Sequence, residues 1–223
     1  MLSIIIPTLN AGAVLKGSLT ALKTSEIRTQ IVVSDGGSTD ETRSIAEQYG
    51  ATVINAPAGR GSQLAAGAKI ATHPWLLFLH ADTRLDTSWQ QSVMAFITNQ
   101  TTPPRAAVFK FSLDDPTPAA RRLERIVAWR CRLLGLPYGD QGLLISRQHY
   151  DQIGGFKGLP LFEDVDMVRR IGRRNIEYLE RSAITSAIRY QKSGYVWRAL
   201  RNATCLSLYF AGLPPKLIGR LYQ

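Results

Sequence analysis

Residues 1–80 alternate short apolar runs with segments of helical periodicity. The runs predict strands at residues 3–6, 30–34, 52–55 and 75–79. The segments between them predict helices at residues 14–22, 40–49 and 63–71. The runs are continuously apolar rather than alternating, which is typical of parallel strands buried on both faces. The sequence therefore predicts an α/β fold: a doubly wound, mostly parallel sheet with helices on both faces.

The second half of the chain has a different pattern. Its predicted strands or extended segments lie at residues 105–113, 142–146 and 176–179. Its predicted helices lie at residues 118–134, 163–173 and 195–210, with a short one after Pro215. In the first of these helices we expect an apolar stripe to pack in the core: Leu123, Ile126, Val127, Cys131 and Leu134. Since no repeat or linker interrupts the pattern, we expect a single domain over residues 1–223.

The charge of the chain favours anionic partners. Its net charge is +10 and its pI about 9.9. Such a charge suits binding to phosphorylated small molecules, to an anionic membrane surface or to nucleic acid. The alternative is that it is simply the charge of a soluble basic surface. RNA-binding proteins interleave aromatic and basic residues for base stacking. Because this arrangement is not evident around the arginine clusters at 121–132 and 169–174, no nucleic-acid partner is expected.

Cysteine usage and the N-terminus predict a cytoplasmic protein. Cys131 and Cys205 lie far apart without metal-ligand spacing, so they form no disulfide framework and suggest a reducing compartment. The N-terminus reaches an apolar run without a basic start, and Pro7 breaks this run, which indicates a strand rather than a signal peptide. No stretch reaches the roughly 18 apolar residues of a membrane span.

Polar segments follow three of the predicted strands at their carboxyl ends. They are PTLN at residues 7–10, DGGSTD at 35–40 and HADT at 80–83. Open α/β sheets bind ligands at this edge, in the loops that follow the strands. We therefore expect the three segments to converge on one crevice.

Asp35 and Asp82 are the carboxylates that these loops offer to a ligand. Asp35, followed by Gly36 and Gly37, suits the edge of a base or ribose, because glycines permit close backbone approach; a plain turn is the alternative. Asp82 is placed to hold a hard cation that bridges phosphates. His80 is either a second ligand of a manganese-like ion or a hydrogen-bonded neighbour.

Two predicted helix starts carry further polar residues. Arg60 lies between two glycines, where its guanidinium suits a pyrophosphate. Ser38 and Glu41 have the spacing of a capping box, in which each side chain bonds the other's backbone N–H.

A Glu-Asp pair opens the predicted helix at residues 163–173. Asp166 has Arg169 and Arg170 at helical spacing, so an ion pair explains it. Glu163 and Asp164 lack such a local partner. They either complement the helix dipole or face a cleft, where an acid serves as general base for an acceptor hydroxyl.

The order PTLN, DGGSTD, HAD and a Glu-Asp pair before a helix resembles the family 2 glycosyltransferases of the GT-A fold. The resemblance covers residues 1 to about 175. GRGSQLAAGA, LHADT, GDQG and FEDVD are similar to a subgroup of small stand-alone bacterial transferases. The resemblance implies a nucleotide-sugar-binding half, about residues 1–100, and an acceptor half, about residues 101–223. The acceptor half would end in amphipathic helices.

The resemblance also implies a reaction: metal-dependent, inverting transfer of a sugar from a nucleotide-sugar, with a UDP-sugar favoured, to an unidentified acceptor. Its implied donor-binding residues are Pro7, Thr8, Leu9, Asp35, Gly36, Arg60 and Asp82. Asp35 would bind uracil, and Asp82 would hold Mg²⁺ or Mn²⁺ against the diphosphate. Asp164 would be the catalytic base, with Gln141 and Glu163 on the acceptor side.

Other function classes fit parts of the sequence. A nucleotidyltransferase that makes a nucleotide-sugar would use a similar first half. It usually needs a Gly-rich basic loop after the first strand, where this chain has only Lys16. A non-catalytic binder of membranes or RNA would instead use the arginine clusters.

The C-terminal segment bears on membrane binding. Residues 195–222 combine aromatic and basic side chains, among them Trp197, Tyr209, Phe210, Arg198, Arg201 and Lys216. This composition suits an interfacial anchor that docks the chain on the inner face of a membrane, beside a lipid-linked acceptor. A helix that packs on the core is the alternative.

Overall fold

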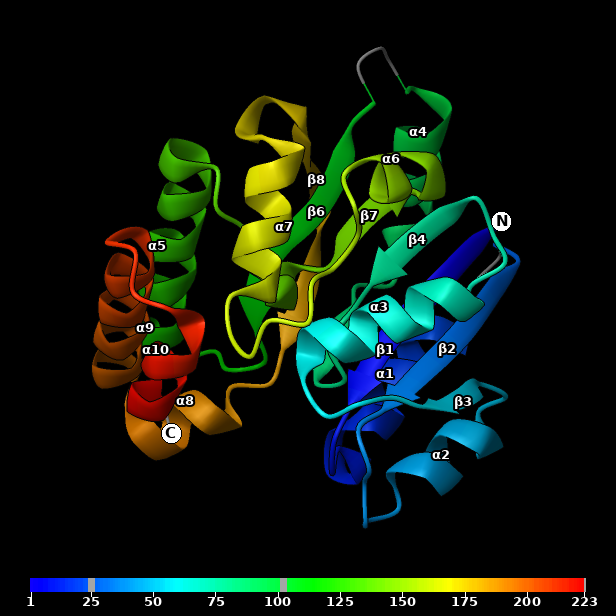
Figure 1. Cartoon of the computed structure of the whole chain (residues 1–223), viewed down its shortest axis with the longest axis horizontal. Coiled ribbons are helices and arrows are strands. Elements are labelled where there is room, and N and C mark those ends of the chain that lie inside the picture. Colours follow the sequence, from blue (N-terminus) through cyan, green and yellow to red (C-terminus); the bar gives the residue numbers. More distant parts are fainter. Residues whose placement is uncertain (24–26, 101–103, 223) are drawn as a thin grey trace.

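The computed structural model describes residues 1–23, 27–100 and 104–222, and one sheet of eight strands runs through them. The strand order is β3-β2-β1-β4-β7-β6-β8-β5, so strands from both halves of the chain share this sheet (Figure 1). The bounds are β1 Leu2–Thr8, β2 Thr29–Asp35, β3 Thr52–Asn55, β4 Trp75–Phe78, β5 Thr83–Leu85, β6 Ala106–Leu113, β7 Leu143–Ser146 and β8 Ile176–Thr185.

Most strands of the sheet run in the same direction. The first four strands along the chain are parallel, with β1 between β2 and β4 and β3 beside β2. β7 pairs antiparallel with both β4 and β6, while β8 is parallel to β6 and antiparallel to β5. The predicted α/β fold is confirmed, and the sheet is mixed because β7 and β5 run opposite to the other strands.

Helices lie between most of the strands. Their bounds are α1 Gly12–Lys23, α2 Thr42–Gln48, α3 Arg60–Ile70, α4 Trp89–Thr98, α5 Pro118–Leu134, α6 Arg147–Gln152, α7 Glu163–Ile171, α8 Ile188–Ser193, α9 Tyr195–Phe210 and α10 Pro215–Tyr222, with short 3-10 turns η1 Gly139–Gln141 and η2 Arg173–Asn175. The predicted helices at 118–134 and 195–210 agree with α5 and α9. β5, α4, α6 and α8 were not predicted.

Both faces of the sheet are covered, as alternate residues of β1 illustrate. Ile4 and Ile6 belong to a buried cluster that includes side chains of α1 and α4, such as Trp89. Ile5 belongs to a second cluster with side chains of α3, α7 and α9. Burial of each such side chain contributes about 1.5–3 kcal/mol relative to exposure, so the strand is stabilised from both faces.

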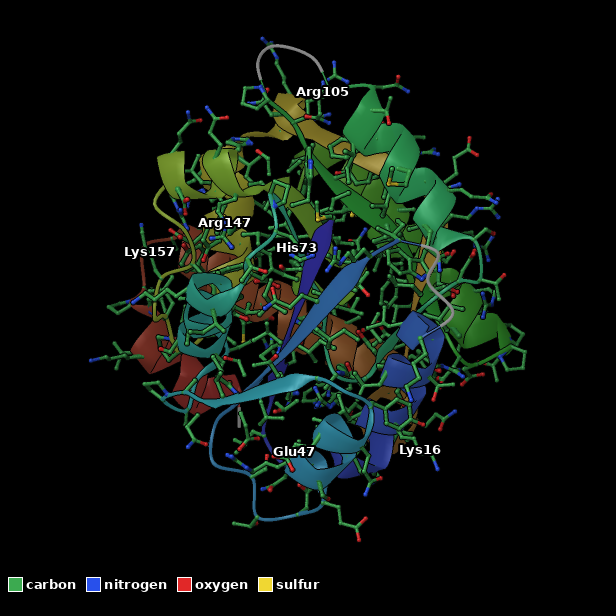
Figure 2. The ribbon with its side chains drawn as sticks, turned by 90° about the vertical axis from the view of Figure 1, so that its right-hand side faces the viewer. Lys16, Glu47, His73, Arg105, Arg147 and Lys157 are labelled. Atoms are coloured by element: carbon green, nitrogen blue, oxygen red, sulfur yellow. The ribbon has the colours of Figure 1, made fainter. Side chains whose placement is uncertain are left out.

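Hydrogen bonds of side chains also hold neighbouring segments against the first strands and α3. Arg147, at the start of α6 and labelled in Figure 2, donates hydrogen bonds to the carbonyls of Ala68 (3.2 Å) and Ala71 (2.6 Å) at the end of α3. The N–H of His73, labelled in the same figure, donates to Ser3 Oγ (3.1 Å) in β1. These bonds hold α6 and the loop before β4 in register with the first strands.

α5 has clear start and stop signals. Thr117 Oγ1 accepts a hydrogen bond from the N–H of Ala120, Pro118 occupies the first turn, and Gly135 ends the helix in the left-handed conformation. Cys131 is buried, as predicted, with Leu123 and Val127. The predicted stripe was too wide, however, because Ile126 and Leu134 are exposed; the face that bears them borders a cleft.

Helices α8, α9 and α10 lie together beside α5, on the side of the molecule away from β2 and β3 (Figure 1). α9 packs on α5, and α10 packs on α9. Cys205, Leu206 and Ile218 are buried in this arrangement. No helix in the described ranges is long and apolar enough to cross a membrane.

Candidate active site

Asp35 organises the loop between β2 and α2. Its carboxylate accepts hydrogen bonds from Thr8 Oγ1 (3.0 Å), from the N–H groups of Gly37 (3.1 Å) and Ser38 (2.9 Å), and from Ser38 Oγ (2.5 Å). The side chain is 0% exposed. Burial alone would raise the pKa of Asp35, but the bonds from Ser38, Thr8 and Gly37 outweigh it and lower the pKa.

The predicted capping box is wrong. α2 begins after Glu41, whose side chain makes no capping bond. Ser38 bonds Asp35 instead, and Ser38 Oγ also accepts from the N–H of Asn10 (2.8 Å). Asp40 Oδ1 accepts from the N–H of Thr42 (3.0 Å) at the start of the helix. The spacing misled because Ser38 bonds Asp35 and the loop after β1, and Asp40 bonds the first turn of the helix in its place.

The loops after β1 and β2 are held together by Gln63 of α3. Its buried amide donates to the carbonyls of Thr8 (2.5 Å) and Ser34 (3.0 Å). A Cβ at Gly36 would lie 2.9 Å from Gln63 Nε2 and 3.4 Å from Thr8 O, so only glycine fits without displacement. Pro7 and Thr8 are buried, whereas Leu9 is exposed. The residues predicted to bind the base therefore do lie together.

Asp82 follows β4 and is fixed by the end of β8. Its carbonyl accepts from the N–H of Ser186 (3.1 Å), and the hydroxyls of Thr83 and Thr185 are 2.9 Å apart. The side chain is partly buried, and its Oδ2 lies 3.9 Å from Arg189 Nη2 on α8. Sequence reasoning missed Arg189, because α8 is short and follows no apolar pattern.

Asp164 lies near the start of α7 and faces the turn before β7. Its Oδ2 accepts from the N–H of Gly139 at 2.8 Å. A Cβ at Gly139 would lie 2.6 Å from His80 Nε2 and 3.5 Å from Asp164 Oδ2, so glycine lets both side chains approach the turn. Burial, with Arg60 and Arg189 nearby, holds the pKa of His80 well below its usual range. The imidazole is therefore neutral at pH 7.

Glu163 and Arg60 form an ion pair across the molecule. Arg60 Nη1 of α3 donates to Glu163 Oε1 of α7 at 3.1 Å, and the Glu163 side chain is buried while that of Arg60 is half-exposed. Burial and the neighbouring Asp164 raise the pKa of Glu163, and Arg60 partly offsets the rise. The pair explains why Glu163 has no local partner in the sequence.

Asp166 forms the predicted local ion pair. Its Oδ2 accepts from Arg170 Nη2 at 2.6 Å, and Lys157 Nζ lies 3.3 Å from Oδ1. This acid therefore belongs to the structure of α7 and its surroundings.

A cleft of about 420 Å³ brings several predicted site residues together. Arg60, Asp82, Glu163 and Asp164 line it, and so does His80. Its outer wall is apolar and comes from α5 and α9: Leu123, Ile126, Val127, Trp129, Leu134, Ala199, Ala203 and Leu206. The residues gathered around Asp35 do not line this cleft.

Gln141 does not line the cleft either, but its neighbour Asp140 does. Gln141 is buried; its Oε1 accepts from Cys131 Sγ (3.1 Å) and its Nε2 donates to Phe109 O (3.0 Å). Burial raises the pKa of Asp140 to about 6; Arg130 opposes this shift, and Asp164 adds to it. Sequence reasoning singled out the GDQG motif but not Asp140, because a 3-10 turn gives no periodicity that tells which side chain points inward.

The candidate metal site depends on Asp82. In the described residues no group of three or more His, Cys, Asp and Glu side chains could hold a metal ion. Mg²⁺ is commonly bound by one or two carboxylates together with substrate phosphates, and Asp82 offers one partly exposed carboxylate at the cleft. The residues present fit a cation that a diphosphate helps to bind, and do not form an all-protein cage.

Known proteins resemble this chain in sequence. A PGL/p-HBAD biosynthesis glycosyltransferase of Mycobacterium bovis is 39% identical over 106 residues, which is 44% of this chain and 41% of that protein. The chain thus matches less than half the length of this relative. The model of glycosyl transferase family 2 matches residues 3–157.

Solved structures share the fold. TarS of S. aureus in complex with UDP-GlcNAc matches with a TM-score of 0.66 and 18% identity, over 82% of this chain and 58% of that chain. Glucosyl-3-phosphoglycerate synthase of Mycobacterium tuberculosis, in complex with Mn²⁺, UDP and glucosyl-3-phosphoglycerate, matches with a TM-score of 0.60 and 16% identity, over 96% of this chain and 81% of that chain. Both neighbours are GT-A glycosyltransferases. The family model covers more than half of this chain, which therefore belongs to glycosyl transferase family 2.

Proposed function

We propose that this chain transfers a sugar from a UDP-sugar to an acceptor hydroxyl. One observation carries the proposal: Asp82, which follows the central strand β4, and Asp164, at the start of α7, line the same cleft. A phosphate-side carboxylate and a candidate base in one cleft are what such a transfer requires. Family membership and the UDP and UDP-GlcNAc complexes of the fold neighbours support the choice of donor.

The donor would bind along the carboxyl ends of β1, β2 and β4. The base would lie on the backbone of Pro7, Thr8 and Leu9 and against Gly36, in a loop whose shape Asp35 maintains through its hydrogen bonds. Arg60, half-exposed at the start of α3, would contact the base or phosphates, since a guanidinium matches phosphate geometry.

Asp82 would bind Mg²⁺ or Mn²⁺ together with the diphosphate. Such a cation, when bound, neutralises the charge that grows on the departing nucleoside diphosphate. On the protein side, Asp82 is fixed for this role by the bond from Ser186 to its carbonyl and by the contact between Thr83 and Thr185. Arg189 would exchange its contact with Asp82 for the phosphates.

Asp164 would act as the base in a single displacement. The acceptor hydroxyl gives its proton to the Asp164 carboxylate, and its oxygen forms a bond to the anomeric carbon. The bond from this carbon to the diphosphate oxygen breaks on the opposite face, which inverts the configuration. The N–H groups of Gly139 and Val165 hold the two carboxylate oxygens, at 2.8 and 2.7 Å, and so orient the carboxylate. Glu163 supports Asp164 from the acceptor side through its pair with Arg60, and Gln141 holds the turn that carries Gly139.

The acceptor would have an apolar portion. The wall of the cleft beyond Asp164 consists mainly of aliphatic and aromatic side chains of α5 and α9. Ile126 and Trp129 line it and are nevertheless 58% and 62% exposed. A lipid-linked acceptor would cover these side chains while its hydroxyl reaches Asp164.

The same region favours contact with an anionic membrane on the cytoplasmic side. Val196, Trp197 and Leu200 of α9 are exposed, and the sequence contains no Asp or Glu after Glu180. Exposed apolar side chains on a purely basic segment suit an interfacial surface rather than contact with a second copy, which would bring like charges together.

A thermal-shift titration with UDP, with and without Mn²⁺, tests the donor site. A ligand at about 100 times its Kd stabilises the folded state by about 2.7 kcal/mol. We expect a UDP-dependent rise in Tm that requires Mn²⁺ in the wild type and is lost in Asp82→Ala. The matched control, Asp86→Ala, alters an acid outside the cleft and should retain the shift. No shift with any nucleoside diphosphate would contradict the proposal, and pyrophosphate release from a nucleoside triphosphate and a sugar phosphate would favour a nucleotidyltransferase instead.

A further inference from the structure

Two oppositely charged side chains of the cleft each have a buried polar atom without a partner. Asp140 Oδ1 and Arg130 Nη2 are buried and have no hydrogen-bond partner among the described residues. Both side chains line the cleft that contains Asp82 and Asp164. Since the great majority of buried polar atoms in native proteins are hydrogen-bonded, this pair of atoms points to a ligand.

The Arg130 side chain and the turn that bears Asp140 are both fixed by contacts. The turn that bears Asp140 is fixed by the bond from Gly139 to Asp164 (2.8 Å) and by Thr185 Oγ1, which donates to the Asp140 carbonyl (3.3 Å). Arg130 donates from Nε to Leu136 O (3.0 Å), and its guanidinium lies 3.5 Å from the centre of the Tyr138 ring. The guanidinium of Arg130 and the backbone that carries Asp140 are therefore positioned before a ligand arrives.

The chemistry of the two atoms restricts the ligand. A carboxylate only accepts hydrogen bonds, and a guanidinium only donates them. A phosphate would satisfy Arg130 but be repelled by Asp140 and its acidic neighbours, and an ammonium or a metal ion would leave Arg130 unpaired. A hydroxyl both donates and accepts, and adjacent hydroxyls of a sugar do so at two points, so a neutral sugar satisfies both side chains.

We propose that Asp140 and Arg130 form a subsite that binds hydroxyl groups of a sugar in the cleft, with the carboxylate accepting from and the guanidinium donating to them. The inference rests on the proposed function, because the sugar is either the one carried by the UDP donor or part of the acceptor. It makes Asp140 and Arg130 determinants of which sugar is used, separate from the base Asp164 and the phosphate-side Asp82.

Calorimetric titrations compare UDP with UDP-glucose, UDP-galactose and UDP-GlcNAc in the wild type, Asp140→Asn and Arg130→Lys. A second arm titrates free D-glucose into the UDP-loaded proteins. Loss of a hydrogen bond to a charged group should weaken binding about ten-fold or more. If the hydroxyls belong to the donor, Asp140→Asn weakens binding of a UDP-sugar and leaves that of UDP unchanged. If the hydroxyls belong to the acceptor, Asp140→Asn weakens only the binding of D-glucose to the UDP-loaded protein.

Arg130→Lys retains the charge and a donor, so its loss should be smaller than that of Asp140→Asn. Asp151→Asn, at an exposed acid on α6, is the matched control and should change neither arm. Unchanged affinities in both arms for Asp140→Asn would overturn the inference, and so would equal losses for UDP and UDP-sugars, which would indicate a structural role. Failure of the wild type to bind UDP would instead contradict the proposed function.

Discussion

Asp164 is the residue on which the proposed chemistry depends most directly. Its neutral isostere keeps the shape and one of the two bonds, from Gly139 or from Val165, but cannot take a proton. We expect Asp164→Asn to lower the transfer rate by about 10²–10⁴-fold, the usual contribution of general base catalysis, and to leave the Kd for UDP unchanged. Initial rates of UDP release and calorimetric titration of UDP measure the two effects separately.

Asp166→Asn is the control for that experiment, because Asp166 lies on the same helix but pairs with Arg170 outside the cleft. It should retain transfer. Persistence of transfer in Asp164→Asn, with rates near those of the control, would show that the base has been assigned to the wrong residue.

The sequence predicts some of the individual residues of the site and misses others. Asp82, Glu163 and Asp164 were predicted from their places after a strand and at a helix start, and they do line one cleft. Asp140 was not predicted to be a site residue, although it belongs to the GDQG motif. Which of two neighbouring side chains in a turn points inward depends on contacts with distant residues, here Cys131 and Phe109, which bond Gln141.

At the scale of elements, the start of α3 is fixed by close contact with the loop before α7. A Cβ at Gly61 would lie 2.1 Å from Lys157 O and 3.2 Å from Glu163 Cβ. Gly61→Ala should therefore push α3 away and destabilise the fold by about 1–3 kcal/mol, as overpacking does. Because Arg60 precedes this position, we expect the Kd for UDP to increase as well. Urea unfolding and calorimetric titration measure the two effects.

Gly17→Ala is the matched control, since Gly17 lies inside α1 and a Cβ there would meet only Arg84 Cδ, at 3.4 Å. Because alanine has a higher helix propensity than glycine, this substitution should stabilise the protein by about 0.5–1 kcal/mol. Equal effects of the two substitutions would contradict the packing argument for Gly61.

Asp115 attaches α8 and α9 to the end of β6. Its Oδ2 accepts from Tyr195 Oη (2.6 Å) and Gln191 Nε2 (3.0 Å), and its Oδ1 from the N–H of Thr117 (2.8 Å). These bonds, that from Tyr195 foremost, lower the pKa of Asp115 below its usual 3.8. A depressed folded-state pKa stabilises the fold fully above the unfolded-state pKa, and this stabilisation is lost as the pH falls toward the folded-state pKa.

The stability difference between wild type and Asp115→Asn should therefore be constant above about pH 5 and shrink as the pH falls below 3.8. Urea unfolding between pH 3 and pH 7 measures it, with Asp151→Asn, at an exposed acid, as the control. A difference that grew on acidification would contradict the assignment.

Elements with strong local signals were predicted well, and short ones were missed. α5 agrees with its prediction because Thr117, Pro118 and Gly135 mark its ends. β5 has three residues and exists through its antiparallel pairing with β8, about a hundred residues later in the chain. No local sequence pattern predicts a strand that forms because it pairs with a distant strand.

For the whole molecule, the C-terminal helices predict binding to anionic vesicles. We expect the wild type to co-sediment with vesicles that contain phosphatidylglycerol, and binding to weaken as the salt concentration rises, because charged side chains contribute to it. A Trp197→Glu, Leu200→Glu variant should lose binding, since it replaces exposed apolar side chains by acids.

Met94→Glu is the matched control, because Met94 is also exposed but lies on α4, outside the C-terminal helices. It should bind vesicles like the wild type. Absence of the wild type from the vesicle pellet at low salt would remove membrane docking from the proposal and leave the apolar wall of the cleft to a freely diffusing acceptor.

The position of β7 has a mechanical consequence. Many enzymes close on their substrates by rotating two lobes about a hinge. Here β7 is bonded on one edge to β4, from the first half of the chain, and on the other to β6, from the second half. Rotation of one part of the sheet against the other would break the hydrogen bonds of β7, so the sheet is expected to move as one rigid unit. α8, which carries Arg189 and Tyr190 of the cleft lining, is by contrast attached through the side chains of Asp114 and Asp115 rather than by strand pairing.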